Sequence, residues 1–397
     1  MIKRDEYLRK LIKFKDKKLI KVVTGIRRCG KSTLLKLFRD YLLENKVDST
    51  QIITINFENP DFDNLRNYKS LYDYLKSMLA PNKKNYILLD EIQNVQDYQK
   101  AIDGLYILDN VDLYITGSNA YFMSGELATL LSGRYIEVQM LPLSFKEYTS
   151  VFNDNRDLPT LYKQYLENGS FPYITELEED KEQIQAYLSG IYNTVILKDV
   201  VSRKKISDIS VLESIIKFMF DNIGNITTPK KISDTMTSKG RKVSNHTVEN
   251  YLSALVDSLI LYKANRYDIK GKQYLETQEK YYVVDIGLRY FLLGSKYVDM
   301  GHILENVVYL ELIRRGFKVY IGKVDNLEVD FVVEKNGEIE YYQVAQTVMN
   351  IETLTRELTP LNNIKDHNTK YLITMDNVPK VSYNGIKQIY ALDWFLS

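Results

Sequence analysis

The feature that most constrains the fold is an eight-residue turn at positions 25–32. It reads Gly-Ile-Arg-Arg-Cys-Gly-Lys-Ser. A compact apolar run at residues 19–24 precedes it, and residues 32–43 follow with leucines at helical spacing. A glycine, four further residues, and then Gly-Lys-Ser, placed between a strand and a helix, form the P-loop pattern. Further short apolar runs alternate with helical segments, which predicts a parallel α/β sheet flanked by helices. These runs lie at residues 52–57, 86–89, 113–116 and 135–140.

Each residue type in the turn has a physical use. Glycine lets successive backbone N–H groups point at phosphate oxygens, and the helix N-terminus adds partial positive charge. Lys31 is expected to bridge the β- and γ-phosphates of ATP, and the Ser32 hydroxyl to bind Mg²⁺. The residues predicted to contact the nucleotide are Gly25, Arg27, Arg28, Cys29, Gly30, Lys31, Ser32 and Thr33.

A second motif supports this interpretation. Residues 86–91 read Tyr-Ile-Leu-Leu-Asp-Glu, an apolar strand that delivers two carboxylates at its carboxyl end, where open α/β sheets bind ligands. Asp90 is predicted to hold the Mg²⁺ ion together with Ser32. Glu91 is predicted to orient and polarise the attacking water as a general base. The alternative is an ordinary surface strand end.

Two further positions are candidates for the same reaction. The strand-like run that begins at residue 113 ends in Thr-Gly-Ser-Asn. A polar side chain there, on Thr116 or Asn119, is expected to sense the γ-phosphate, with local turn bonds as the alternative. Arg134 lies between a short predicted helix and the run at 135–140. It is predicted to stabilise transition-state charge in a neighbouring subunit, with a solvated arginine as the alternative.

Together these motifs resemble those of the AAA+ ATPases. The resemblance rests on the P-loop, the Asp-Glu pair, the Thr-Gly-Ser-Asn strand end and the Ser-Gly-Arg at residues 132–134. Over nearly its whole length the chain is similar to bacterial and archaeal ATPases that join an AAA domain to a DUF4143 segment. The resemblance implies that Arg134 is an arginine finger and that Asn56 is the family's polar residue after the second strand. It also implies a helical lid at residues 145–205, in which Arg203 is the candidate lid arginine.

The middle of the chain is locally basic. Residues 203–276 carry 13 Lys and Arg against 8 Asp and Glu, a net charge of +5 in a chain of +1. Their predicted order of helices and a turn-rich alternating stretch is that of a winged helix-turn-helix, whose recognition helix meets DNA with its N-terminal end. The alternative is a protein–protein adaptor. The residues predicted to contact nucleic acid are Lys239, Arg241, Lys242, Asn245, His246 and Arg266.

The last segment resembles the PD-(D/E)XK nucleases in the order of its acidic residues. Glu305 falls on a predicted helix and Asp330 on a strand. On the next strand, Gln343 stands where a second acid is expected and Ala345 where a lysine is expected. Such a site needs acidic Mg²⁺ ligands and a lysine that polarises water. The sequence therefore predicts the fold of these nucleases without their activity.

Composition excludes several classes of protein. The single cysteine cannot form an internal disulfide, and three histidines far apart leave no zinc-type cluster. No apolar stretch approaches the roughly 18 residues of a membrane span, and no secretory signal is apparent. A net charge of +1 gives no global attraction to nucleic acid, so any basic patch is local. We expect a cytoplasmic protein without a membrane partner.

These observations predict an α/β chain in four parts. They are a P-loop AAA+ core (1–142), a helical lid (143–205), a winged-helix domain (206–298) and a degenerate nuclease-like domain (299–397). The leading hypothesis is an ATP-hydrolysing homo-oligomer, a ring such as a hexamer, that translocates on or remodels duplex DNA. Resemblance to Holliday-junction motors favours branched DNA. The alternatives are a nucleotide-dependent switch with protein partners and an ATP-regulated nuclease.

Overall fold

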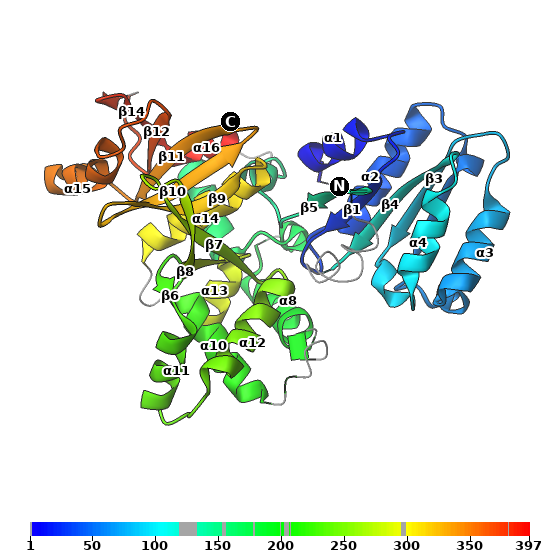
Figure 1. Cartoon of the computed structure of the whole chain (residues 1–397), viewed down its shortest axis with the longest axis horizontal. Helices are drawn as coiled ribbons and strands as arrows, with labels where there is room; N and C mark the ends of the chain where they lie inside the picture. Colours follow the sequence, from blue (N-terminus) through cyan, green and yellow to red (C-terminus); the bar gives the residue numbers. More distant parts are fainter. Residues whose placement is uncertain are drawn as a thin grey trace. The chain divides into compact units, whose positions relative to one another are not determined.

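The structure is a computed structural model of the chain. It describes residues 2–118, 133–152, 156–177, 179–198, 200–201, 206, 208–294, 299–379 and 381–397. The chain divides into two compact units (Figure 1). Unit 1 comprises Met1–Pro142 with Asp257–Leu259, and unit 2 comprises Leu143–Val256 with Ile260–Ser397. Among the helices of the described residues, none is long and apolar enough to cross a membrane.

Unit 1 is built on a five-stranded sheet in the order β2-β3-β4-β1-β5, with every neighbouring pair parallel. The strands are β1 (Ile20–Thr24), β2 (Ile52–Asn56), β3 (Asn85–Asp90), β4 (Val111–Gly117) and β5 (Tyr135–Gln139). β1, β3 and β4 are buried along their whole length. Strands covered on both faces read as continuous apolar runs, which is why the sequence locates them. The predicted α/β fold is confirmed.

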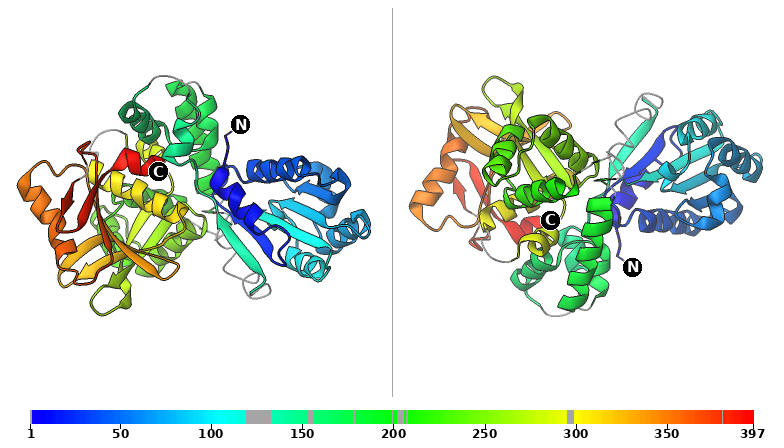
Figure 2. Two further views of the ribbon diagram at one scale, coloured as in Figure 1. Left: turned by 90° about the horizontal axis from the view of Figure 1, so that it is seen from above. Right: turned by 90° about the horizontal axis from the view of Figure 1, so that it is seen from below.

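Helices cover both faces of this sheet (Figure 1 and Figure 2). They are α1 (Asp5–Lys13), α2 (Lys31–Glu44), α3 (Tyr68–Met78) and α4 (Tyr98–Tyr106). Leucines of α3 and α4 join alternate residues of the strands in one buried core. On the other face, the Phe38 ring of α2 packs 4.4 Å from the Tyr114 ring of β4. This contact packs the middle of α2 against the middle of β4.

Unit 2 contains a nine-stranded sheet in the order β13-β14-β12-β11-β10-β9-β7-β8-β6. Its strands are β6 (Ile226–Thr227), β7 (Leu261–Asp268), β8 (Gln273–Val283), β9 (Lys318–Val324), β10 (Leu327–Lys335), β11 (Glu338–Ala345), β12 (Thr369–Thr374), β13 (Ser382–Tyr383) and β14 (Ile386–Tyr390). Its helices include α6 (Phe145–Thr149), α7 (Leu158–Asn168), α8 (Lys181–Ile191), α10 (Ile209–Asp221), α11 (Pro229–Ser238), α12 (Asn245–Asp257), α13 (Ile286–Leu293), α14 (Met300–Arg314), α15 (Ile351–Asn362) and α16 (Ala391–Leu396).

The β7–β8 hairpin and the strands after residue 299 share this sheet. β7 pairs in parallel with β9 through Arg266 opposite Ile321 and Asp268 opposite Lys323. The predicted boundary at residue 298 therefore falls inside one compact unit, as does the predicted boundary of the lid at residue 205. The division of the chain into four parts stays a prediction.

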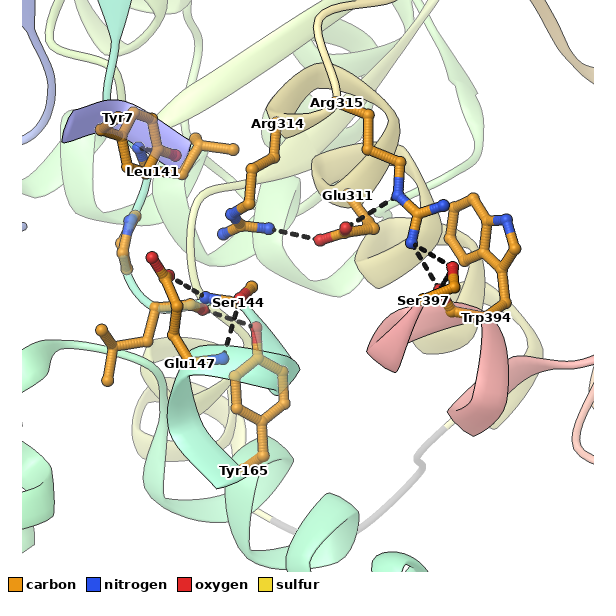
Figure 3. Close-up of polar contacts among 12 residues, drawn as sticks. Tyr7, Leu141, Ser144, Glu147, Tyr165, Glu311, Arg314, Arg315, Trp394 and Ser397 are labelled. Carbon is orange, nitrogen blue, oxygen red and sulfur yellow. Dashed lines mark hydrogen bonds and ion pairs between the residues drawn. The ribbon is translucent and has the colours of Figure 1, made fainter. Parts of the chain in front are cut away.

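The carboxyl terminus is fixed within unit 2 by an arginine pair at the end of α14. Glu311 accepts hydrogen bonds from Arg314 at 2.8 Å and from Arg315 at 2.9 Å (Figure 3). The Arg315 guanidinium also lies 4.2 Å from the centre of the Trp394 ring and donates to the Ser397 hydroxyl at 3.2 Å. The last helix, α16, is thus held against α14 by charge and stacking together.

Candidate nucleotide site

The P-loop joins β1 to α2, and its two glycines are required by geometry. A Cβ atom on Gly25 would lie 2.4 Å from the Met140 carbonyl oxygen and 2.8 Å from the Cys29 sulfur. Gly30 precedes α2 with φ of 105°, a conformation that side chains disfavour. Arg28, between them, is also left-handed, with φ of 69°. The turn therefore curls as the sequence pattern predicts.

Lys31 is buried at the first position of α2. Its Nζ donates to the Gly25 carbonyl at 3.0 Å and lies 3.2 Å from Glu91 Oε1. Burial is the largest single influence and acts to lower the pKa of Lys31, but Glu91, Cys29 and Asp90 together outweigh it and raise the pKa. The side chain is thus a charged ammonium group that already faces a negative partner.

Asp90 ends β3, and its carboxylate is bonded to two hydroxyls. The Thr116 hydroxyl donates to Asp90 Oδ1 at 2.6 Å, and Ser32 supplies a second hydrogen bond. Burial raises the pKa of Asp90, and these two hydrogen bonds oppose the rise. A carboxylate beside a hydroxyl at the start of a phosphate loop is a donor set of hard oxygens, which suits Mg²⁺.

Glu91 follows Asp90 in a left-handed conformation, with φ of 53° and ψ of 46°. Its N–H donates to the Thr116 hydroxyl at 2.9 Å. Its Oε2 accepts hydrogen bonds from the Ser118 hydroxyl and from Gln93 Nε2. Burial favours a higher pKa for Glu91, but Lys31 and these two donors outweigh it and lower the pKa. The carboxylate is therefore ionised, as a general base must be.

Four residues around this site, Gln93, Ser118, Arg4 and Tyr7, have no role that a motif of the sequence predicts. Gln93 and Ser118 lie just beyond the ends of β3 and β4, and the only signal for them is that position. Arg4 is buried before α1 and donates to the Cys29 carbonyl at 2.8 Å and to the Leu141 carbonyl at 2.6 Å. The Tyr7 hydroxyl accepts from the Leu141 N–H at 3.1 Å (Figure 3). The N-terminal segment thus braces the P-loop.

The other residues predicted near the nucleotide are Thr116, Asn56, Asn119 and Arg203. Thr116 is fully buried and hydrogen-bonded to both Asp90 and Glu91, so it supports this acid pair. Its role as a γ-phosphate sensor stays a prediction. The Asn56 side chain accepts from the Glu58 N–H at 2.8 Å, and Glu58 pairs with Arg27. Asn119 and Arg203 lie outside the described residues.

Arg134 is exposed at the start of β5 and is held by α4 of its own chain. Its Nη1 lies 2.6 Å from Asp103 Oδ1, and its guanidinium is 5.5 Å from the centre of the Tyr106 ring. An exposed ion pair of this kind contributes little and exchanges easily. Arg134 can therefore leave this partner for a stronger anion.

The candidate nucleic-acid residues gather mainly where α12 begins. Lys242, Asn245 and His246 are exposed there, and Lys239 is exposed at the end of α11. Arg241 differs, because its guanidinium donates to the Ser210 carbonyl at 2.8 Å and to the Ser214 hydroxyl at 2.6 Å, both on α10. Arg266 lies on β7 and is bonded to Gln278.

A lysine from outside the predicted nuclease-like segment lies beside the acids of that segment. Lys280 of β8 is buried, with its Nζ 3.0 Å from Glu305 and 2.6 Å from Glu328. Asp330 accepts from the Val344 N–H at 2.8 Å, and burial, with Glu305 beside it, raises its pKa well above the usual range. The Gln343 amide donates to Glu357 at 2.9 Å. Lys280 is therefore the lysine beside these acids, although the nuclease pattern expects one at position 345, where this chain has Ala345.

Two family models match parts of the chain. An AAA domain matches residues 17–149, and a domain of unknown function, DUF8612, matches residues 159–299. An uncharacterised protein of Haemophilus influenzae is 43% identical over 401 residues, covering 100% of this chain and 99% of its own. The uncharacterised protein MJ1544 of Methanocaldococcus jannaschii is 31% identical over 335 residues, covering 81% of this chain and 71% of its own.

Among solved structures, the Walker-type ATPase PABY2304 of Pyrococcus abyssi shares the fold. It aligns with a TM-score of 0.51 at 16% identity, over 74% of this chain and 96% of its own. The domain matched at residues 159–299 is DUF8612, whereas the resemblance in sequence predicts DUF4143. The DUF4143 and nuclease-like assignments are therefore not confirmed.

Proposed function

The chain belongs to one family of AAA+ ATPases with the H. influenzae and M. jannaschii proteins, and we propose that it couples ATP hydrolysis to work on DNA. One observation supports the proposed ATP hydrolysis. Lys31, Ser32, Asp90 and Glu91 converge at the carboxyl edge of the unit 1 sheet, with the acids held by hydroxyls of β4 and α2. This is the constellation that phosphoryl transfer to water requires.

The residues divide the reaction between them. Lys31 and the loop N–H groups hold the β- and γ-phosphates, and the γ-phosphate takes the place of Glu91 beside Lys31. Ser32 and Asp90 would hold Mg²⁺, which would neutralise charge on the phosphate oxygens. Glu91 then accepts a proton from water as the water oxygen bonds to the γ-phosphorus. The bond between that phosphorus and the β–γ bridging oxygen breaks, which gives ADP and phosphate.

Arg134 is proposed to complete the site of a neighbouring subunit in a ring. The support for this is its exposure and its exchangeable pairing with Asp103. An Arg134→Ala protein should bind ATP and turn it over slowly, because transition-state charge loses a partner. Mixing it with a Glu91→Gln protein should restore activity, since some mixed interfaces combine an intact Arg134 with an intact Glu91. Mixtures no faster than either variant alone would contradict a finger acting between subunits.

The DNA half of the proposal rests on the exposed basic and polar side chains at the start of α12. A Lys239→Ala/Lys242→Ala protein should lose two phosphate contacts, which flattens the slope of log K against log[salt] on duplex DNA by about 2. Arg241 is left in place because it holds α10. The matched control is Lys181→Ala/Lys365→Ala, which removes two exposed lysines elsewhere in unit 2. Equal slopes for both double variants would contradict this interface.

The central experiment measures ATP turnover with single-stranded, duplex and branched DNA side by side. Stimulation by DNA supports a DNA-linked ATPase, and the greatest stimulation by branched DNA supports the preferred substrate. ATP turnover that no DNA alters would favour the nucleotide-dependent switch with protein partners. A Lys31→Ala protein should lose ATP binding itself, because the ammonium group contacts the phosphates in every step.

A further inference from the structure

In the described part of the structure, only one of the two polar atoms of the Gln93 amide has a hydrogen-bond partner. Its Nε2 donates to Glu91 Oε2, whereas its Oε1 is buried and has no hydrogen-bond partner among the described residues. The assignment of the two amide atoms is fixed by chemistry, because an ionised carboxylate only accepts hydrogen bonds and must face the NH₂ group. A buried acceptor without a donor is costly, so native proteins pair such atoms with a side chain or an ordered water.

The position of Gln93 is set by the backbone just before it. Glu91 is left-handed and turns the chain away from β3 into the short helix Ile92–Asn94. This turn brings the amide of Gln93 back to the carboxylate two residues earlier. Ser118, after β4, donates to the same Oε2 atom. Oε2 is therefore held by the protein, while Oε1 faces Lys31 at 3.2 Å.

Because Gln93 and Ser118 bind Oε2, only Oε1 of Glu91 is left to act as the general base. When a γ-phosphate takes the place of Glu91 beside Lys31, Oε1 becomes free to accept a proton, and Oε2 stays fixed by Gln93 and Ser118. We propose that Gln93 is a second catalytic residue of this site, which orients the attacking water through Oε1 while its Nε2 aligns Glu91. Ser118 is a positioning residue that acts through Glu91. The inference rests on the proposed ATP hydrolysis.

The step balances in atoms and charge. One O–H of the water donates a hydrogen bond to Gln93 Oε1, and the proton of the other O–H passes to Glu91 Oε1. The water oxygen forms its bond to the γ-phosphorus, and the bond to the β–γ bridging oxygen breaks. Fixing both O–H groups places a lone pair of the water toward phosphorus, which is the orientation that in-line attack needs.

The test replaces Gln93 by methionine, which keeps its length and removes both polar atoms. We expect kcat for ATP to fall about 10- to 100-fold with KM nearly unchanged, because the amide acts only on the water and the base. A Gln93→Glu protein should not rescue the rate, because a carboxylate cannot donate to Glu91. Gln96→Met is the matched control, since Gln96 is an exposed glutamine three residues on. It should keep the parent kcat.

Ser118 is tested in parallel. Ser118→Ala should lower kcat, and Ser118→Thr, which keeps the hydroxyl, should restore it. A Gln93→Met protein that turns over at the parent kcat, or that changes KM with kcat intact, would overturn the inference and leave the proposed ATPase standing. A parent protein that does not hydrolyse ATP would overturn the proposed function and the inference with it.

Discussion

In unit 1, Lys31 stands beside Asp90 and Glu91, and in unit 2, Lys280 stands beside Glu305 and Asp330. Both clusters are buried, and both place a lysine ammonium about 3 Å from a glutamate oxygen. They differ in what surrounds the lysine. Lys31 begins the helix α2, and a helix N-terminus favours an anion. Lys280 lies in the interior of β8, between Glu305 and Glu328.

The surroundings of the two lysines explain why one ion pair can exchange its partner and the other cannot. At Lys31, the glutamate can leave because a phosphate brings negative charge and the loop amides stabilise it. At Lys280, two carboxylates share one ammonium group inside a sheet, and removing either charge leaves the others poorly paired. The first cluster is suited to binding and turnover, whereas the second is suited to holding β8, β10 and α14 together.

The largest expected effect separates the two glutamates. Glu91→Gln should lower ATP turnover about 10²- to 10⁴-fold and leave ATP binding nearly intact, because the general base is lost and the phosphate ligands remain. Glu305→Gln is the matched change in unit 2 and should leave the rate per folded molecule unchanged. Steady-state turnover and binding of a labelled ATP analogue measure both. If Glu91→Gln hydrolyses ATP at the parent rate, Glu91 is not the general base.

The second effect is on stability. Lys280→Met should destabilise unit 2 by about 3–5 kcal/mol, because the buried Glu305 carboxylate loses its ammonium partner. Lys263→Met on β7 is the control, since its pair with Glu279 is exposed and is worth about 0–1 kcal/mol. The chain has one tryptophan, Trp394, so its fluorescence during urea unfolding reports on unit 2. Equal losses for both variants would mean that Lys280 is not a structural anchor.

The smallest expected effect is on nucleic acid integrity. Asp330→Ala should change neither ATP turnover nor the state of a DNA substrate, because Gln343 replaces an acid and Lys280 is already engaged by two glutamates. Incubation of supercoiled DNA with the parent and the variant in Mg²⁺ or Mn²⁺ measures this. A nick made by the parent and absent with Asp330→Ala would make the two clusters alike and support the nuclease alternative.

The two clusters were not equally predictable from the sequence. The P-loop and the Asp90-Glu91 pair are local patterns, each read within one strand and the turn after it. Lys280 carries no such pattern, because its place beside Glu305 depends on the packing of β8 against α14, a helix that comes later in the chain. Non-local packing of this kind is set by the whole unit and not by any single segment.

Smaller misses have the same origin. Arg241 reads as a phosphate contact because it lies in a basic run, yet its guanidinium bonds to α10, which lies about 30 residues earlier in the chain. Gln93 and Ser118 are ordinary polar residues in the sequence and become informative only where they meet at Glu91. Residue type and spacing predicted the charges of the site, but not the neutral side chains that hold them.

The parallel pairing of β7 with β9 has a practical consequence for dissecting the protein. A chain that ends before residue 299 would keep the β7–β8 hairpin and lose the strand that covers one side of β7 at residues 266–268. The main-chain N–H and C=O groups there would face solvent as an open strand edge, and such edges recruit other chains. The basic segment expressed alone is therefore prone to self-association, and its DNA binding is best measured in the full-length protein.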